Sequence, residues 1–501
     1  MFSSRLQQRA LDFLALLAGL CLTLAYEPFG WWPVAFVSLG LLFWLWQLGS
    51  VKRACWRGFL FGVGLFGSGA SWVYVSIHEF GHTPAIAAAL LTIGFVMLLA
   101  VLTPVSCAYV YRRFFTHASP MAIMLALPAL WLLFEWLRGW ILTGFPWLNV
   151  GYSQTDSLLS GIAPVLGVYG VCYVVALIAT LLMLIITRSE LRVFFITSVF
   201  AVLGLSWFLQ GIPWSKPLDE PLKVTLLQGN VSQHDKWQPG QREIIMQRYR
   251  ELTEANLDSD LIIWPETAIP AFFHNVINDY LADIEDMALA SKTDMLIGVP
   301  VKRVEGDRVY YYNSMVSIGE EQRFYHKRHL VPFGEYVPFG DVIRTFGGFF
   351  NLPMSDFVSG GLQQPDIKVA GHTVGISICY EDAFGEEVIL ALPQASMLVN
   401  VSNDAWFGDS LAPHQHLQIA RMRAIETARP LLRATNTGIT AVIDPFGRLM
   451  HRVPQFMETA LSVEVQPMTG ATPYALLGNA GILWFAGISL LLAGFMSRQP
   501  A

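Results

Sequence analysis

Long apolar runs separated by short polar segments fill the first 211 positions of the chain. A helix that crosses a lipid bilayer needs about 20 mostly apolar residues. Runs of this kind predict seven spans, at residues 10–26, 32–49, 58–77, 84–111, 121–137, 162–187 and 193–211, and an eighth at 475–496. The pattern therefore predicts a polytopic helical bundle of about eight spans.

The pattern changes between residues 212 and 470, where short apolar strands alternate with more polar helical stretches. Predicted strands include 222–230, 261–267, 309–318, 322–328 and 373–381, and helices are expected at 240–257, 277–291, 382–392 and 415–429. Such alternation is typical of an α/β sandwich. We therefore expect three parts: a membrane domain at 1–211, a soluble domain at 212–470, and a last span with a short tail at 471–501.

Composition agrees with a membrane location. The chain is 54% hydrophobic and only 14% charged, and its mean hydropathy is +0.46. A soluble protein carries about 25% charged residues. The net charge of −6 argues against a nucleic-acid partner, because binding to phosphates needs a basic surface.

Basic residues in the short loops predict the orientation of the spans, because loops on the cytoplasmic side are rich in Lys and Arg. One set of alternate loops and termini carries Arg5, Arg9, Lys52, Arg53, Arg57, Arg112, Arg113, Arg188, Arg192 and Arg498. The opposite short loops carry only Arg138. Both termini are therefore expected in the cytoplasm, with residues 212–470 in the periplasm.

A single cysteine stands out in the soluble stretch. The five cysteines are Cys21, Cys55, Cys107, Cys172 and Cys379. Only Cys379 lies in the soluble stretch, at the end of the predicted strand "TVGISICYED" (373–382). A lone buried cysteine usually behaves as a small apolar residue. The alternative is a nucleophile.

Other reactive side chains also follow predicted strands. Glu266 ends "LIIWPET", and Lys327 and Glu335 lie in "FYHKRHLVPFGE". Strand ends are where α/β folds build active sites, although a Glu or Lys there is often only a solvated loop residue. A thiol becomes a good nucleophile when a base removes its proton, and a lysine can stabilise the negative charge that forms on an attacked carbonyl.

These motifs resemble the nitrilase superfamily. "WPET", "HKRHLVPFGE" and "ICYED" occur in the order and at the spacing of that superfamily, which implies a Glu–Lys–Cys triad on an α-β-β-α sandwich. Together with the spans, the chain resembles the apolipoprotein N-acyltransferase family. Stretches that support this resemblance are "GSGASWVYVSIHEFG" (67–81), "RGWILTGFPWLNVGYSQ" (138–154), "QGNVSQHDKW" (228–237), "SNDAWFGDS" (402–410) and "ARPLLRATNTGITAVIDPFG" (428–447).

The resemblance implies roles for individual residues. Glu266 would be the general base, Lys327 the partner of the oxyanion and Cys379 the nucleophile. Supporting positions implied in the same way are Glu335, Tyr380 and Glu381, with Trp237 on a mobile loop.

The resemblance also implies a reaction. Cys379 would take an acyl chain from the sn-1 position of a phospholipid, for which the resemblance implies phosphatidylethanolamine, and hold it as a thioester. The amine of a diacylglyceryl-cysteine apolipoprotein would then accept it in a ping-pong reaction, the final step of lipoprotein maturation. The implied setting is the inner membrane of Gram-negative bacteria, with a monomeric enzyme and neither cofactor nor metal.

The segment 330–357 is rich in aromatic residues and glycine. Its phenylalanines are Phe333, Phe339, Phe346, Phe349, Phe350 and Phe357. They can form a patch buried in the domain, or an arm that enters the outer leaflet and guides acyl chains. Trp406, in "DAWFGDS", is a further candidate for a lid.

Other hypotheses stay open at this point. A membrane-tethered amidase of the nitrilase type would share the triad and use water as its second nucleophile. A transporter or sensor with an inert domain would be expected to have lost a member of the triad. His414 and His416 lack the further ligands of a zinc site, and Glu135 with Arg138 is interpreted as a structural pair.

Overall fold

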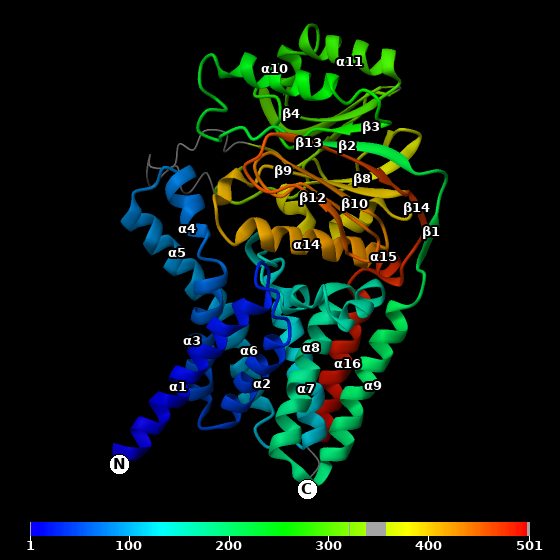
Figure 1. The fold of residues 1–501 in the computed structure, drawn as a ribbon. Helices are drawn as coiled ribbons and strands as arrows, with labels where there is room; N and C mark the ends of the chain where they lie inside the picture. Colours follow the sequence, from blue (N-terminus) through cyan, green and yellow to red (C-terminus); the bar gives the residue numbers. More distant parts are fainter. Residues whose placement is uncertain (1, 320, 337–356, 498–501) are drawn as a thin grey trace.

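The computed structural model describes residues 2–319, 321–336 and 357–497. A bundle of apolar helices forms one half of the molecule, and a domain of sheets and helices sits on one end of that bundle (Figure 1). The helices of the bundle are α1 (Phe2–Leu22), α2 (Val34–Gln47), α3 (Val51–Gly69), α5 (Ala85–Ala100), α6 (Ser106–Phe114), α7 (Pro120–Arg138), α8 (Ala163–Thr187), α9 (Arg192–Gln210) and α16 (Ala480–Met496).

Length and hydropathy make five of the described helical segments able to cross a membrane. They are Arg5–Ala25, Ala85–Phe114, Pro120–Arg138, Leu158–Thr187 and Ser189–Gln210. A sixth arises if Val51–Gly69 and Val73–Phe80, which are bent by 61°, form one span. The helices at the expected second and eighth spans, Val34–Gln47 and Ala480–Met496, are shorter. The structure therefore supports a membrane-embedded bundle, while the count of eight stays a prediction.

Small residues and one buried ion pair hold the bundle together. An added Cβ at Gly64 would overlap the backbone of α1, and one at Gly62 would lie 2.5 Å from Ala100 Cβ, so both glycines permit close helix contact. Glu135 and Arg138 form a fully buried pair at 2.5 Å. Arg138 Nη1 also donates to the carbonyl of Trp147 at 2.6 Å, so this pair is structural, as the sequence predicted.

Two six-stranded sheets form the centre of the second domain. Their orders are β13-β2-β3-β4-β5-β6 and β12-β11-β10-β9-β8-β7. The strands of the first sheet are β2 (Leu222–Gln228), β3 (Leu261–Ile263), β4 (Asp294–Glu305), β5 (Arg308–Ile318), β6 (Phe324–His326) and β13 (Thr459–Val465). Those of the second are β7 (Ile367–Val369), β8 (His372–Ile378), β9 (Met397–Ser402), β10 (Leu431–Thr435), β11 (Ala441–Ile443) and β12 (Leu449–Arg452).

Helices cover the outer faces of both sheets. The helices α10 (Gln241–Glu254) and α11 (Tyr280–Ser291) lie over the first sheet, and α14 (Ala412–Thr427) lies between the second sheet and the bundle (Figure 1). A small pair of strands, β1 (Ser215–Pro217) and β14 (Met468–Gly470), joins the two ends of the domain. This arrangement confirms the predicted α-β-β-α sandwich.

One predicted element is wrong. Residues 382–392 were expected to form a helix, but they form only a short α13 (Gly385–Val388) between 3₁₀ turns at Cys379–Ala383 and Ile389–Ala391. The Glu381 side chain accepts a hydrogen bond from the Ile378 N–H, which closes a tight turn instead of continuing a helix. An added Cβ at Gly385 would overlap Arg423 of α14, so this segment also runs directly against that helix.

The sandwich is fixed to the bundle through α14. Gln415 accepts a hydrogen bond from Trp147 Nε1 at 2.6 Å and donates to the carbonyl of Gly69 at 3.1 Å. In the last turn of α14, Glu426 accepts a hydrogen bond from the Val168 N–H of α8 at 2.6 Å. These buried contacts hold one face of the second sheet at the end of the apolar helices.

Candidate active site

Both sheets contribute to one cluster of reactive side chains. Lys327 follows β6 directly, and Glu266 lies in the loop after β3 in the same sheet. Cys379 follows β8 of the other sheet. Lys327 Nζ lies 3.6 Å from Glu266 Oε1, and the charges of both residues act on the Cys379 thiol. The structure therefore brings these three side chains together from three strands.

Cys379 sits on a strained turn. Its φ is +53°, a left-handed value that a residue other than glycine rarely adopts, and its side chain is only 8% exposed. Its carbonyl oxygen accepts hydrogen bonds from Asn400 Nδ2 at 3.3 Å and is 3.2 Å from His416 Nε2. Backbone strain of this kind is kept where the surrounding structure enforces it, often at functional sites.

Glu266 is held by both of its oxygens. Oε1 accepts a hydrogen bond from Asn313 Nδ2 at 2.7 Å, and Oε2 accepts one from the Asn403 N–H at 2.7 Å. An added Cβ at Gly298 would overlap the carbonyl of Pro265, so glycine in β4 allows the loop of Glu266 to lie close to the strand. The carboxylate is thus fixed in position.

Lys327 is a buried cation. Its Nζ lies 2.9 Å from Glu335 Oε2 and donates to Oε1 at 3.0 Å. Burial by itself would lower the pKa of Lys327, but the carboxylates of Glu335 and Glu266 outweigh it and raise the pKa well above the ordinary value. Asn313 Nδ2 donates to Glu335 Oε1 at 2.9 Å as well as to Glu266, so one amide links both carboxylates.

The thiol of Cys379 is a weak acid in this environment. Burial raises its pKa, the negative charge of Glu266 raises it further, and the positive charge of Lys327 only partly offsets them. The thiol is therefore protonated near pH 7. A base must take the proton of this thiol during attack. Glu266 is the candidate base, because the charge of its carboxylate acts on the thiol.

Glu381 connects the two sheets. Its Oε2 accepts hydrogen bonds from the Ile378 N–H at 2.6 Å and from Tyr325 Oη at 2.9 Å. Its Oε1 accepts from the N–H groups of Arg328 and His329. Burial raises the pKa of Glu381 to about 7, while the hydrogen bonds from Ile378 and Arg328 oppose that rise.

Tyr380 connects the site to the bundle. Its hydroxyl donates to the carbonyl of Gly144 at 3.2 Å, and its ring stacks on that of Trp147 with centroids 6.2 Å apart. The nucleophile's own loop is therefore in direct contact with the membrane domain.

The described residues among the predicted lid residues are more exposed than the three reactive side chains. Trp237 is 43% exposed and Phe333 is 50% exposed. Trp406 packs against Phe80 of the bundle, with ring centroids 5.7 Å apart, and its carbonyl accepts a hydrogen bond from Ser76 Oγ at 2.8 Å. Phe339, Phe346, Phe349 and Phe350 lie outside the described residues. The roles assigned to all these residues stay predictions.

Three residues of the site were missed by the sequence reasoning. Asn313 lies inside β5, and Asn403 lies in a stretch quoted only for its resemblance. Lys236 is buried next to the predicted lid residue Trp237, and burial lowers its pKa to about 8 although Glu266 opposes this. For Asn313 the only available signal was a polar residue in a strand, and that signal does not say which carboxylates its amide meets.

His416 takes part in a buried polar network. Its Nε2 lies 2.9 Å from Asp382 Oδ1, and its Nδ1 lies 3.1 Å from Asp404 Oδ1 and 2.9 Å from Arg433 Nη2. Within the described ranges, no group of three or more His, Cys, Asp or Glu side chains is arranged to hold a metal ion. His416 Nε2 also lies 3.2 Å from the carbonyl oxygen of Cys379, and this contact supports the turn at the cysteine.

Comparisons with known proteins cover nearly the whole chain. The family model of the apolipoprotein N-acyltransferase N-terminal domain matches residues 18–181, and that of carbon-nitrogen hydrolase matches residues 223–474. The apolipoprotein N-acyltransferase of Methylococcus capsulatus is 46% identical over 468 residues, which are 93% of this chain and 92% of that protein. The enzyme of the same name from Nitrosomonas europaea is 44% identical over 494 residues, 96% of this chain and 97% of that protein.

Two solved structures of much lower identity each cover about half of this chain. Nit3 of Saccharomyces cerevisiae, a member of the nitrilase superfamily, is 19% identical and covers 50% of this chain and 93% of its own, with a TM-score of 0.38. A carbon-nitrogen hydrolase from Helicobacter pylori is 16% identical and covers 56% of this chain and 95% of its own, with a TM-score of 0.37.

Proposed function

The chain belongs to the apolipoprotein N-acyltransferase family, and from this premise we propose how it carries out lipoprotein N-acylation. The acyl donor is a phospholipid, phosphatidylethanolamine, cleaved at its sn-1 ester. The acceptor is the N-terminal amine of a diacylglyceryl-cysteine apolipoprotein. The observation that carries the proposal is the cluster of Glu266, Lys327 and Cys379 at the end of a membrane-embedded bundle.

In the first half-reaction, the Cys379 thiol gives its proton to Glu266, and the sulfur attacks the ester carbonyl. Negative charge forms on the carbonyl oxygen, where the Lys327 ammonium stabilises it. The C–O bond to the glycerol oxygen then breaks. Glu266 returns the proton to that oxygen, so lysophospholipid leaves and the acyl chain stays on Cys379 as a thioester.

In the second half-reaction, the neutral α-amine of the apolipoprotein attacks the thioester. An α-amino group has a pKa of about 7.7–8.0, so a useful fraction is neutral near pH 7. Glu266 takes a proton from the attacking nitrogen and gives it to the Cys379 sulfur as the C–S bond breaks. The products are an amide and the regenerated thiol, which completes a ping-pong cycle.

Water competes with the amine while the thioester waits, so the site has to exclude it. Burial of the Cys379 side chain supports such exclusion. We assign Trp237, Phe333 and Trp406 to lids and acyl-chain contacts, together with Phe339, Phe346, Phe349 and Phe350. Glu335, Tyr380 and Glu381 support the reacting groups.

The proposal includes the setting of the enzyme. Residues 1–211 form the membrane domain, residues 212–470 the periplasmic catalytic domain, and residues 471–501 the last span and a short tail. The enzyme lies in the inner membrane with both termini in the cytoplasm, and it acts as a monomer. The asymmetry of basic residues in the loops supports this orientation.

The test is an intact mass of the purified protein after incubation with phosphatidylethanolamine and no acceptor. We expect a mass gain of one acyl chain that hydroxylamine removes, that a diacylated lipopeptide discharges, and that the Cys379→Ala protein does not show. Free fatty acid without any adduct would favour a hydrolase. Intact phospholipid would contradict the proposed donor.

A further inference from the structure

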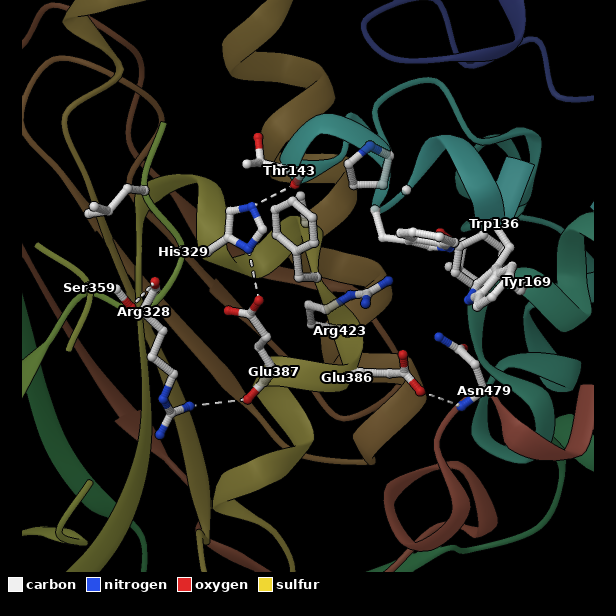
Figure 2. A pocket seen from close by; sticks show the side chains of 18 of the residues that line it. Trp136, Thr143, Tyr169, Arg328, His329, Ser359, Glu386, Glu387, Arg423 and Asn479 are labelled. Carbon is white, nitrogen blue, oxygen red and sulfur yellow. Dashed lines mark hydrogen bonds and ion pairs between the residues drawn. The ribbon is translucent and has the colours of Figure 1, made fainter. Parts of the chain in front are cut away.

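A cavity of about 640 Å³ lies where the sandwich meets the bundle (Figure 2). The bundle contributes Trp136 of α7, Trp140 just beyond that helix, and Tyr169 of α8 to its lining. The sandwich contributes Phe384. Within the described part of the chain, none of the three predicted catalytic side chains lines this cavity. It is therefore a candidate binding site beside the thiol.

The cavity lies at the level where the apolar helices end. Trp136 lies in the last turn of α7, Trp140 lies two residues beyond its end, and Asn479 stands at the start of α16, the last apolar helix. Trp140 is 52% exposed. Tryptophan and tyrosine concentrate at the boundary between the hydrocarbon and the headgroups of a bilayer. The cavity thus lies at the level of lipid headgroups.

Four residues that line this aromatic cavity each carry a buried polar atom without a partner. Within the described residues, Arg328 Nε, Arg423 Nε, Glu387 Oε2 and Asn479 Oδ1 are buried and have no hydrogen-bond partner. Buried polar groups are normally paired, because an unpaired group has lost its hydrogen bonds to water. Two of these atoms donate and two accept. A ligand that carries both donors and acceptors would satisfy them after small side-chain rotations.

Asn479 is the most informative of these residues. It occupies the cap position before α16, where asparagine usually accepts a hydrogen bond from the helix, yet its side chain makes no capping hydrogen bond. Within the part of the chain that the structure describes, its backbone alone is paired: the N–H donates to Glu386 Oε1 at 3.2 Å, and the carbonyl accepts from the Leu483 N–H at 3.1 Å. The side chain is 4% exposed and lines the cavity. The helix therefore does not explain this buried amide.

The charges around the cavity have both signs. Arg328, Arg423, Glu386 and Glu387 all line the cavity (Figure 2). Arg328 Nη1 donates to the carbonyl of Glu387 at 3.2 Å, and Arg423 Nη1 also pairs with Glu426 at 3.0 Å. Arginine suits a phosphate, and a carboxylate suits an ammonium group. A headgroup that carries both a phosphate and a primary ammonium matches this lining, because each of its charges meets side chains of the opposite sign.

We propose that this cavity binds the headgroup of one phosphatidylethanolamine molecule that is not the molecule being cleaved. Tyr380 packs against His329 and Phe384, which line the cavity, but does not line it itself, so its ring lies behind the cavity wall. The aromatic side chains of the bundle contact the glycerol and the first carbons of the acyl chains. The lipid bridges the sandwich and the helices.

The test uses the full-length Cys379→Ala protein in detergent, which cannot transfer an acyl chain. Native mass spectrometry counts the retained molecules of phosphatidylethanolamine or of phosphatidylglycerol with the same acyl chains. We expect the affinity for one phosphatidylethanolamine to fall about tenfold in the double variant Glu387→Gln, Asn479→Leu, because it loses charged and neutral acceptors of the ammonium group. The matched control, Glu243→Gln with Asn278→Leu, changes exposed residues of the sandwich and should keep that affinity.

A charge-adding variant covers the case in which the double variant does not fold. Asn479→Asp places a carboxylate near the ammonium group, so it should retain phosphatidylethanolamine and bind phosphatidylglycerol more weakly. Equal retention of the two lipids by the Cys379→Ala protein would overturn the proposal, and so would an unchanged affinity in a folded double variant. If a diacylated lipopeptide displaced the lipid from this site alone, the cavity would be an acceptor site instead. Because no turnover is measured, this test can fail independently of the proposed reaction.

Discussion

Glu381 holds the backbone next to two reactive side chains. It accepts hydrogen bonds from the N–H groups of Ile378, which precedes Cys379, and of Arg328, which follows Lys327. Those residues belong to different sheets, so one carboxylate sets the distance between nucleophile and cation. We interpret Glu381 as a positioning residue.

Glu381→Gln should therefore slow acylation of Cys379 by about 10²-fold, because small displacements of reacting groups have effects of that size. A glutamine has one acceptor oxygen, and its NH₂ group would face N–H donors. The measurement is the rate of thioester formation by rapid quenching and intact mass, with KM for the lipid expected to stay nearly constant. Glu321→Gln, at an exposed carboxylate, serves as the control. A normal acylation rate in Glu381→Gln would show that acylation does not need the hydrogen bonds of the Glu381 carboxylate.

Deprotonation of His416 at alkaline pH should lower the stability of the folded protein. Burial and Arg433 lower its pKa, but Asp382 and Asp404 outweigh them and raise it from 6.5 to about 9. A raised pKa in the folded state means that the full stabilisation is present below pH 6.5 and is lost as the pH rises through about 9. The shift corresponds to a loss on the order of 3 kcal/mol. Thermal unfolding between pH 6.5 and 9.5 should show it.

The comparison with His416→Gln isolates this residue. Lys236, whose pKa is lowered to about 8, titrates in the same range, but it is present in both proteins and cancels in the difference. His416→Gln should be less stable at pH 6.5 and lose the downward step towards pH 9.5. Parallel pH profiles of the two proteins would mean that His416 is not charged in the folded state.

Single residues were predictable only where a motif names them. Glu266, Lys327 and Cys379 follow strands in recognisable stretches, and the structure brings them together. Asn313 and His416 could not be predicted, because their contacts depend on how two sheets and α14 stack. A polar residue inside an apolar strand or helix shows that a partner exists, but only the tertiary arrangement says which one.

At the scale of elements, one glycine fixes the shape of α8. Gly167 has φ +66° inside that helix, and an added Cβ would overlap the ring of Tyr474. The Gly167 ψ of −175° places it in a backbone region that is essentially open only to glycine, so Gly167→Ala combines a backbone cost of about 1–3 kcal/mol with this overlap. Thermal unfolding in detergent should therefore show a clear loss of stability. Gly204→Ala is the control, because nothing lies within 4 Å of its Cβ in α9.

Gly204→Ala should be neutral or slightly stabilising, since alanine has the higher helix propensity. If both variants unfold at the same temperature as the unmodified chain, the kink in α8 is not needed for folding. Equal destabilisation of both would point to a general intolerance of the bundle, and not to the contact between Gly167 and Tyr474.

Element type was predicted well where the period of the pattern was clear. The stretches at 240–257 and 415–429 became α10 and α14 with small changes of boundary, and the paired strands β5 and β6 were expected. The helix predicted at 382–392 was wrong because the apolar spacing of this stretch fits a helix, while the fold has tight turns there. The contact with Arg423 and the reach of Glu381 to Ile378 decide that turn, and neither is visible in a local pattern.

At the scale of the whole molecule, the two halves were predictable but their docking was not. Trp147 meets Gln415, and Gln415 meets Gly69, across hundreds of positions of sequence. Composition shows that residues 1–211 favour lipid and that residues 212–470 favour water. It does not show that α14 faces the helices, or that a cavity opens between α7, α16 and the segment after Cys379.

The orientation of the whole molecule gives the last prediction. In a chain whose native cysteines are replaced, a cysteine at Asn278 would stand on the exposed surface of the sandwich, and one at Glu190 would stand between α8 and α9. Arg188 and Arg192 flank Glu190, so that loop should be cytoplasmic. An impermeant maleimide should label Asn278→Cys in intact spheroplasts, and Glu190→Cys only after lysis.

The opposite labelling pattern would place the sandwich in the cytoplasm and contradict the proposed site of lipoprotein acylation. Labelling of Glu190→Cys before lysis, with an intact cytoplasmic marker enzyme, would break the link between basic loops and orientation for this chain. The expected pattern has a mechanistic consequence. Because α14 faces the bundle, a periplasmic sandwich places Cys379 next to the outer leaflet, so the donor lipid reaches the thiol from that leaflet and without crossing the membrane.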